Sequence, residues 1–149
     1  MYYVDYSVVM SSPLSIRFDA ALLARLRRRA QSATGSSTSA LAQRLIDEGL
    51  RMADHPGVIF KDGPSGRRAA LAYGPDIWEI IKYLREIDDR GPAALDAAAE
   101  AFAADPGRIA TAVSYYGDYP AEITAEITAA DEASLRAEQA WRVRQQLIA

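Results

Sequence analysis

The side chains of this sequence offer little for covalent or metal chemistry. The chain has no cysteine and a single histidine, His55, so no zinc site with thiolate ligands can be assembled. No serine lies in a Gly-x-Ser-x-Gly turn, and Gly-Pro-Ser-Gly at 63–66 lacks the ending of a phosphate-binding loop. Asp88 and Asp89 fit an exposed helix end more simply than a cation site. We therefore expect no catalytic residue, no metal and no cofactor, and interpret His55 as a linker residue.

Arginine supplies 15 of the 17 basic residues, so ionic contacts with a partner would be made mainly by guanidinium groups. The net charge of the chain is −3, yet residues 1–54 carry +2, while residues 55–120 carry −3 and residues 121–149 carry −2. A basic amino-terminal part in an otherwise acidic chain suits contact with nucleic acid at that end and a different partner at the other.

The elements that would position the first arginines lie in residues 13–53. Residues 14–18 alternate between apolar and polar side chains, which predicts a half-buried strand with Ser15 and Arg17 on its polar face. Asp19 is predicted to cap a helix that ends at Gly35. A second helix begins at Ser36 and Ser37. The two helices carry apolar stripes, formed by Leu22, Leu23, Leu26 and Ala30 and by Leu41, Leu45, Ile46 and Leu50.

A unit of this size buries too little apolar surface to be stable alone, because segments shorter than about 40 residues usually need a metal, a disulfide or a partner chain. A second copy is therefore expected. If the strands at 14–18 pair antiparallel across a two-fold axis, their apolar faces cover four helices and their polar faces form a two-stranded ribbon. Such a ribbon fits the major groove of DNA.

These residues resemble the ribbon-helix-helix DNA-binding proteins of the Arc, MetJ and CopG type. The resemblance implies that Ser15 and Arg17 read bases and that the amino end of the second helix, at Ser37, Thr38 and Ser39, binds a phosphate. Pro13 stands where a basic or polar residue is often found. The simpler interpretation is an ordinary edge strand followed by a helix cap. The run at 27–29 is most simply a solvated helix face, with Arg28 as a candidate for DNA backbone contact.

After a linker at 54–57, the sequence predicts a hairpin around Asp62-Gly-Pro-Ser-Gly66 and three helices, each opened by a proline, at Pro75, Pro92 and Pro106. Residues 59–123 resemble the family called domain of unknown function 433, a small fold similar to a helix-turn-helix, through three pieces: IFKDGPSGRRAAL, GPDIWEI and AVSYYGDYPAEI. That resemblance implies an antitoxin context. The aromatic residues of this part are most simply core residues, namely Trp78, Phe102, Tyr115 and Tyr116.

Residues 121–149 favour a long helix with a one-sided apolar pattern that needs a cover, either the preceding unit, a second copy or another protein. A tryptophan with neighbouring arginines is typical of an interface anchor. The candidate partner-binding residues are Leu135, Trp141, Arg142, Arg144 and Leu147. The antitoxin resemblance implies a PIN-type ribonuclease toxin as the partner, with Arg142 or Arg144 pairing with its metal-binding carboxylates.

The sequence thus predicts a mainly α protein: an arm at 1–12, a ribbon-helix-helix domain at 13–54 that forms an intertwined homodimer, a hairpin plus three-helix unit at 55–120, and a helical tail at 121–149. The expected function is a DNA-binding antitoxin that represses its own promoter. The alternative is a stand-alone repressor whose second unit senses a ligand or sets the oligomeric state. We expect no enzyme and no membrane partner, and the lack of cysteine favours the reducing cytoplasm.

Overall fold

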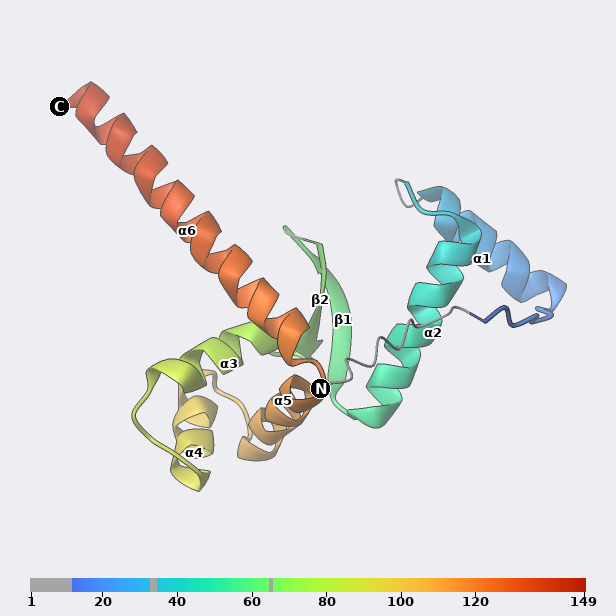
Figure 1. Cartoon of the computed structure of the whole chain (residues 1–149), viewed down its shortest axis with the longest axis horizontal. Coiled ribbons are helices and arrows are strands. Elements are labelled where there is room, and N and C mark those ends of the chain that lie inside the picture. Colours follow the sequence, from blue (N-terminus) through green and yellow to red (C-terminus); the bar gives the residue numbers. More distant parts are fainter. Residues whose placement is uncertain (1–11, 33–34, 65) are drawn as a thin grey trace, which may run out of the picture. The chain divides into compact units, whose positions relative to one another are not determined.

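The computed structural model describes residues 12–32, 35–64 and 66–149 and is mainly helical, with one small hairpin (Figure 1). The predicted arm at 1–12 lies outside the described residues except for Ser12. The elements follow in the order α1 (Ala20–Ser32), α2 (Thr38–Asp54), β1 (Val58–Gly63), β2 (Gly66–Leu71), α3 (Ile77–Glu86), α4 (Pro92–Ala101), α5 (Pro106–Asp118) and α6 (Pro120–Ile148). The chain divides into two compact units, residues 1–44 and 45–149, so α2 continues across the division.

The first unit contains α1 and the start of α2, two helices that the sequence predicted. Asp19 caps α1, because its Oδ1 accepts a hydrogen bond from the backbone N–H of Leu22 at 2.9 Å. Gly35 has φ +82°, the left-handed conformation expected of a residue that ends a helix. Ser37 caps α2, since its Oγ accepts from the N–H of Ala40 at 3.1 Å. The caps that the sequence predicted at the starts of α1 and α2 are therefore confirmed.

The strand expected over residues 14–18 is absent from the single chain. Residues 12–19 have no regular secondary structure, and Leu14 and Ile16 are 81% and 49% exposed. The backbone groups of a strand need a neighbouring strand for their hydrogen bonds. Within the described residues, the only strands are β1 and β2, and these pair with each other. A ribbon made by two copies stays a prediction.

The second unit is built on the hairpin and on α3 to α6. Strands β1 and β2 are antiparallel, in a register that places Val58 opposite Leu71 and Gly63 opposite Gly66. Prolines stand at the start of α4, α5 and α6. Pro75 does not open α3, because Asp76 is the cap residue of that helix and Glu79 accepts from the Asp76 backbone N–H at 2.8 Å.

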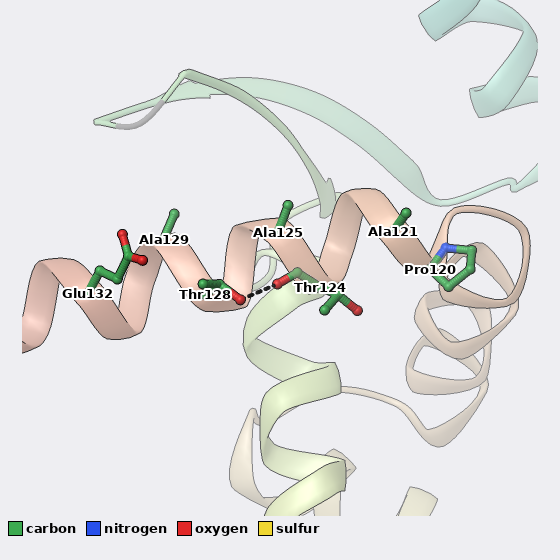
Figure 2. A pocket seen from close by; sticks show the side chains of 7 residues that line it. All are labelled: Pro120, Ala121, Thr124, Ala125, Thr128, Ala129 and Glu132. Atoms are coloured by element: carbon green, nitrogen blue, oxygen red, sulfur yellow. Dashed lines mark hydrogen bonds between the residues drawn. The ribbon is translucent and has the colours of Figure 1, made fainter.

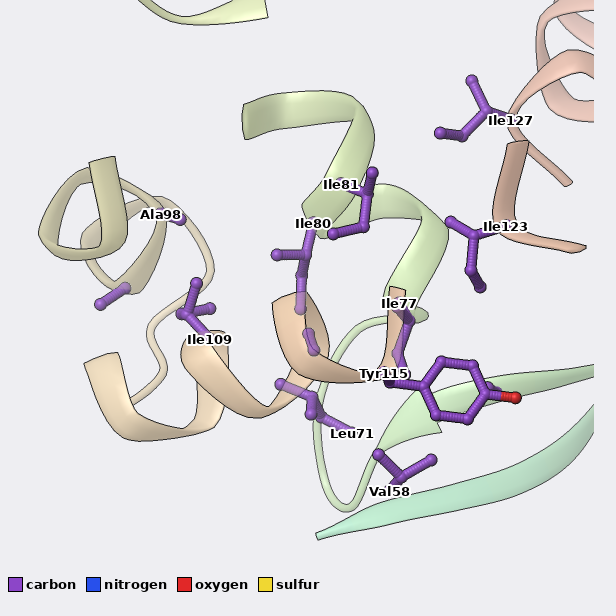
Figure 3. Packing of buried hydrophobic residues seen from close by; sticks show 13 residues of the cluster. Val58, Leu71, Ile77, Ile80, Ile81, Ala98, Ile109, Tyr115, Ile123 and Ile127 are labelled. Atoms are coloured by element: carbon purple, nitrogen blue, oxygen red, sulfur yellow. The ribbon is translucent and has the colours of Figure 1, made fainter. Parts of the chain in front are cut away.

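The hydrophobic core of this unit lies where the hairpin, α3, α5 and the first turns of α6 meet (Figure 3). Tyr115 of α5 is fully buried at its centre, and Trp78, Phe102 and Tyr116 pack against its edge, so the prediction of core aromatics is confirmed. Ile123 and Ile127 attach α6 to this core. Beyond residue 131, every residue of α6 is exposed, and Figure 1 shows this half of the helix projecting from the rest of the unit.

Candidate nucleic-acid interface

The predicted base-reading residues lie on the segment that precedes α1. Ser15 and Arg17 are both exposed there. Among the described residues no hydrogen bond or ion pair engages the guanidinium of Arg17, so its five N–H donors are available to a ligand. The segment also exposes the apolar side chains of Leu14 and Ile16. An arginine without a protein partner and an uncovered apolar pair therefore occur together within residues 14–17.

The amino end of α2 offers free backbone donors. Ser37 and Ser39 are exposed and Thr38 is half-buried. The N–H groups of Ala40 and Leu41 are taken by the side chain and the carbonyl of Ser37. The N–H groups of Thr38 and Ser39 belong to the first turn and have no acceptor in their own helix. A helix terminus with free N–H groups and hydroxyl side chains favours a phosphate oxygen electrostatically and by hydrogen bonding.

Helix α1 carries the densest basic surface. Arg25, Arg27, Arg28 and Arg29 are all exposed, while Ala30 is buried. Arg28 lies one turn after Arg25 on the same helix face, so the two cations can follow a phosphate backbone together. The structure thus leaves Arg28 accessible, as a contact with DNA would require, although a solvated face has the same appearance.

The carboxyl-terminal half of α2 takes part in a partly buried polar cluster that the sequence did not predict. Arg51 Nη1 donates to Tyr115 Oη at 2.9 Å and to Glu122 Oε2 at 2.7 Å, and Tyr115 Oη donates to Glu122 Oε1 at 3.0 Å. Arg51 also lies over the ring of Tyr119, 4.1 Å from its centroid. The cluster joins α2, α5 and α6 through residues as far as 71 positions apart. No local pattern in the sequence could have revealed it.

Burial and hydrogen bonding shift the acid–base properties of this cluster. Burial raises the pKa of the Tyr115 hydroxyl, so it stays protonated and can donate to Glu122. For Arg51, burial alone would lower the pKa, but its hydrogen bonds with Glu122 and Tyr115 outweigh burial and leave the pKa raised. The arrangement therefore keeps a charged pair and a neutral phenol at neutral pH, which suits a structural clamp.

Two further polar contacts involve Glu48 and His55, which both belong to the second unit. Glu48 accepts a two-pronged hydrogen bond from Arg67 of β2, with Nε at 2.6 Å and Nη2 at 2.8 Å. His55 is 5% exposed, and its Nε2 lies 2.9 Å from Asp118 Oδ2. His55 does lie in the connection between α2 and β1, as the sequence predicted, but its burial was not predicted: its ring packs edge-on against Tyr115 with centroids 5.3 Å apart.

The predicted partner-binding residues lie on the exposed half of α6. Leu135, Trp141 and Leu147 are 59%, 55% and 86% exposed. Arg142 is ion-paired with Glu138 one turn earlier, whereas no side chain among the described residues pairs with Arg144. An exposed tryptophan beside an unpaired arginine matches the composition of an interface anchor. The prediction that something covers this helix is confirmed only for its first turns, which pack on the second unit.

A shallow groove of about 630 Å³ runs along the first half of α6 (Figure 2). Its lining consists of small or hydroxyl side chains with one carboxylate, namely Pro120, Ala121, Thr124, Ala125, Thr128, Ala129 and Glu132. The hydroxyl of Thr128 is already used, because it donates to the carbonyl of Thr124 at 3.1 Å. The groove therefore presents a packing surface rather than a set of converging reactive groups.

Comparison of the sequence with protein-family models, and of the chain with curated proteins and solved structures, finds no match. The functional argument thus rests on the residues and their geometry. Within the part of the chain that the structure describes, no three His, Asp or Glu side chains are grouped to hold a metal ion. Among the same residues, no helix is both long and apolar enough to cross a membrane.

Proposed function

We propose that this chain binds DNA as a homodimer in which residues 14–18 of two copies pair into a two-stranded ribbon. The observation that carries the proposal is the exposure of Leu14 and Ile16 next to the unpaired Arg17. Further apolar side chains of α1 and α2 are exposed in the single chain, namely Leu22, Leu45, Ile46 and Leu50. A second copy would remove these side chains from water, and an uncovered apolar set of this kind usually marks an interface.

The proposed ribbon has a defined geometry. Antiparallel pairing over residues 14–18 about a two-fold axis places Ile16 opposite Ile16 of the second copy and Ser15 opposite Arg17. The polar face then carries two serines and two arginines. A guanidinium fork matches the two acceptors of guanine in the major groove, which makes Arg17 the specificity residue. The amino end of α2 would hold the flanking phosphate through Ser37, Thr38 and Ser39.

We further propose that the protein is an antitoxin of a type II system, which represses its own promoter and binds its toxin through the exposed half of α6. Support comes from Trp141, Leu147 and the unpaired Arg144, which stand on a helix that the second unit does not cover. A PIN-type ribonuclease fits as the toxin, because a guanidinium can pair with the carboxylates of its metal site. The stand-alone repressor remains the second candidate, favoured by a pocket in the second unit that a ligand would fill.

The first test compares two arginine variants for binding to the DNA upstream of the coding sequence. Arg17→Ala should cost roughly 1–3 kcal/mol and relax the preference at one base position, since it removes a base contact. Arg28→Ala should weaken binding to all sequences alike and make the dependence on salt less steep, since it removes a phosphate contact. Equal behaviour of Arg17→Ala and the wild-type chain would remove residues 14–18 from DNA recognition.

The second test separates the antitoxin from the stand-alone repressor. A chain truncated after Asp131 keeps Ile123 and Ile127 and therefore keeps the core contacts of α6. It should still bind DNA but should no longer co-purify with a small ribonuclease of the PIN type from the native host. Co-purification that survives the truncation would place toxin binding elsewhere. If the intact chain binds DNA and no toxin is found, the repressor is favoured.

A further inference from the structure

A second cavity, of about 560 Å³, lies within residues 45–149, between the end of the hairpin, the start of α3 and the middle of α6. Charged and aromatic side chains line it together with small ones. The charged and aromatic lining residues are Arg68, Trp78, Glu126, Glu132 and Arg136. Alanines of α6 form the apolar wall, including Ala129 and Ala133. A cavity with an apolar wall and a few polar groups is the usual form of a small-ligand site.

Glu126 is the cavity-lining carboxylate with an unsatisfied oxygen. Its Oε2 is buried, and no hydrogen-bond donor among the described residues reaches it. Both cations of the cavity wall form ion pairs with other carboxylates: Arg68 Nε lies 3.1 Å from Asp76 Oδ2, although without an aligned hydrogen bond, and Arg136 Nη1 lies 3.8 Å from Glu132 Oε2. A buried carboxylate oxygen without a donor is rare in folded proteins and costly when ionised. When ionised, Glu126 is therefore a carboxylate that a cationic ligand can pair with.

The surroundings of Glu126 determine the pH at which its carboxyl group ionises. Burial, followed by repulsion from Glu122, raises its pKa to about 7, with Asp76 adding to the effect and Arg68 opposing it. The carboxyl is thus divided between its neutral and ionised forms near neutral pH. A cation that enters the cavity would favour the ionised form, so its binding would release a proton.

Trp78 provides the second recognition element. Its indole Nε1 donates to Asp76 Oδ2 at 3.2 Å, which holds the side chain in the cavity wall and satisfies its only donor. The ring carbons are then what Trp78 offers to a ligand. Aromatic rings attract guanidinium and ammonium groups and pack well against alkyl chains.

We propose that this cavity binds an alkyl guanidinium or primary ammonium group. The charged head pairs with the carboxylate of Glu126, which lines the cavity, and the alkyl chain lies along Trp78 and the alanines of α6. The same chemistry occurs in free aliphatic amines and in the arginine or lysine side chain of another protein. This proposal concerns only the second unit and does not depend on DNA binding.

Isothermal titration of the full chain at pH 7 with agmatine, and separately with the peptide Gly-Gly-Arg-Gly-Gly, tests the proposal. Binding should occur with net proton release, seen as a different apparent enthalpy in two buffers. Glu126→Gln, which keeps the shape of the side chain, should weaken binding by roughly tenfold to a hundredfold, since hydrogen bonds to charged groups are the strong ones. Glu100→Gln removes the same charge from an exposed residue of α4 outside the cavity lining and should change binding by less than about threefold.

A second variant, Ala133→Leu, fills the cavity without changing Glu126 and should also abolish binding. It keeps the proposal testable if Glu126→Gln fails to fold. Binding of agmatine would identify free amines as a source of the ligand, and binding of the peptide alone would identify a protein side chain. Absence of binding to both probes would overturn the proposal. So would equal losses for Glu126→Gln and Glu100→Gln, because the carboxylate of Glu126 would then have no special role in binding.

Discussion

Removal of the Tyr115 hydroxyl tests whether the cluster with Arg51 and Glu122 acts as a clamp within the second unit. Tyr115→Phe keeps the fully buried ring in the core and deletes only the oxygen that accepts from Arg51 at 2.9 Å and donates to Glu122 at 3.0 Å. The direct pair between Arg51 and Glu122, at 2.7 Å, survives the change. The variant therefore removes two hydrogen bonds to charged groups without leaving a charge unpaired.

The expected loss follows from that geometry. Hydrogen bonds to charged groups contribute about 1.5–3 kcal/mol, and the surviving ion pair places the loss from Tyr115→Phe near the lower end, at about 1.5–2 kcal/mol. For a unit of this size, 1 kcal/mol corresponds to roughly 4 °C in the unfolding midpoint. Urea denaturation followed by circular dichroism, with thermal unfolding beside it, measures both quantities.

Tyr116→Phe is the matched control, because it removes the same atom from the next residue. The Tyr116 hydroxyl accepts from Arg85 at 2.8 Å in an exposed position, so its loss should cost less than about 0.5 kcal/mol. Equal stability of the two variants would refute the clamp, since the buried hydroxyl would then contribute no more than the exposed one.

Three further predictions concern other parts of the chain. Gly35→Ala should lower the free energy of unfolding by about 1–2 kcal/mol in urea denaturation, because φ is +82° there while the space for a methyl group is open; an unchanged midpoint would contradict it. The pKa of Glu126 lies near 7 in the folded chain and at 4.5 in the unfolded chain, so the free energy of unfolding should fall as pH rises from about 5 to 7. Thermal unfolding at several pH values measures this fall, and Glu126→Gln should lack the contribution that Glu126 makes to it. Trp141→Ala should change the unfolding midpoint by less than about 0.5 kcal/mol, because the side chain is exposed, yet weaken toxin binding in a pull-down; a destabilised variant would mean that Trp141 packs within the protein.

Elements with local signals were predicted well from the sequence. Asp19 and Ser37 mark helix starts through the hydrogen bonds that their own side chains accept, and Gly35 marks a helix end through its backbone freedom. The hairpin around Asp62-Gly-Pro-Ser-Gly66 was also predicted. Each of these features depends on a few neighbouring residues, which a pattern can report.

Features that depend on distant residues were not predicted. Arg51 meets Glu122 across 71 positions, and the burial of His55 goes with its contacts to Tyr115, Tyr119 and Asp118, more than 50 positions away. The free oxygen of Glu126 results from the way the hairpin, α3 and α6 enclose it. Residues 14–18 differ in kind, because their alternation describes a strand whose partner would come from a second copy.

Cross-linking at position 16 tests the proposed ribbon most directly. The chain has no cysteine, so Ile16→Cys introduces a unique thiol. Pairing over 14–18 would place the two copies of this residue opposite each other, with Cα atoms about 4.5–5.5 Å apart, which is within the range of a disulfide. We predict that mild oxidation yields a covalent dimer that still binds the upstream DNA. A chain that binds this DNA while Cys at position 16 stays reduced, in monomers, would contradict the account.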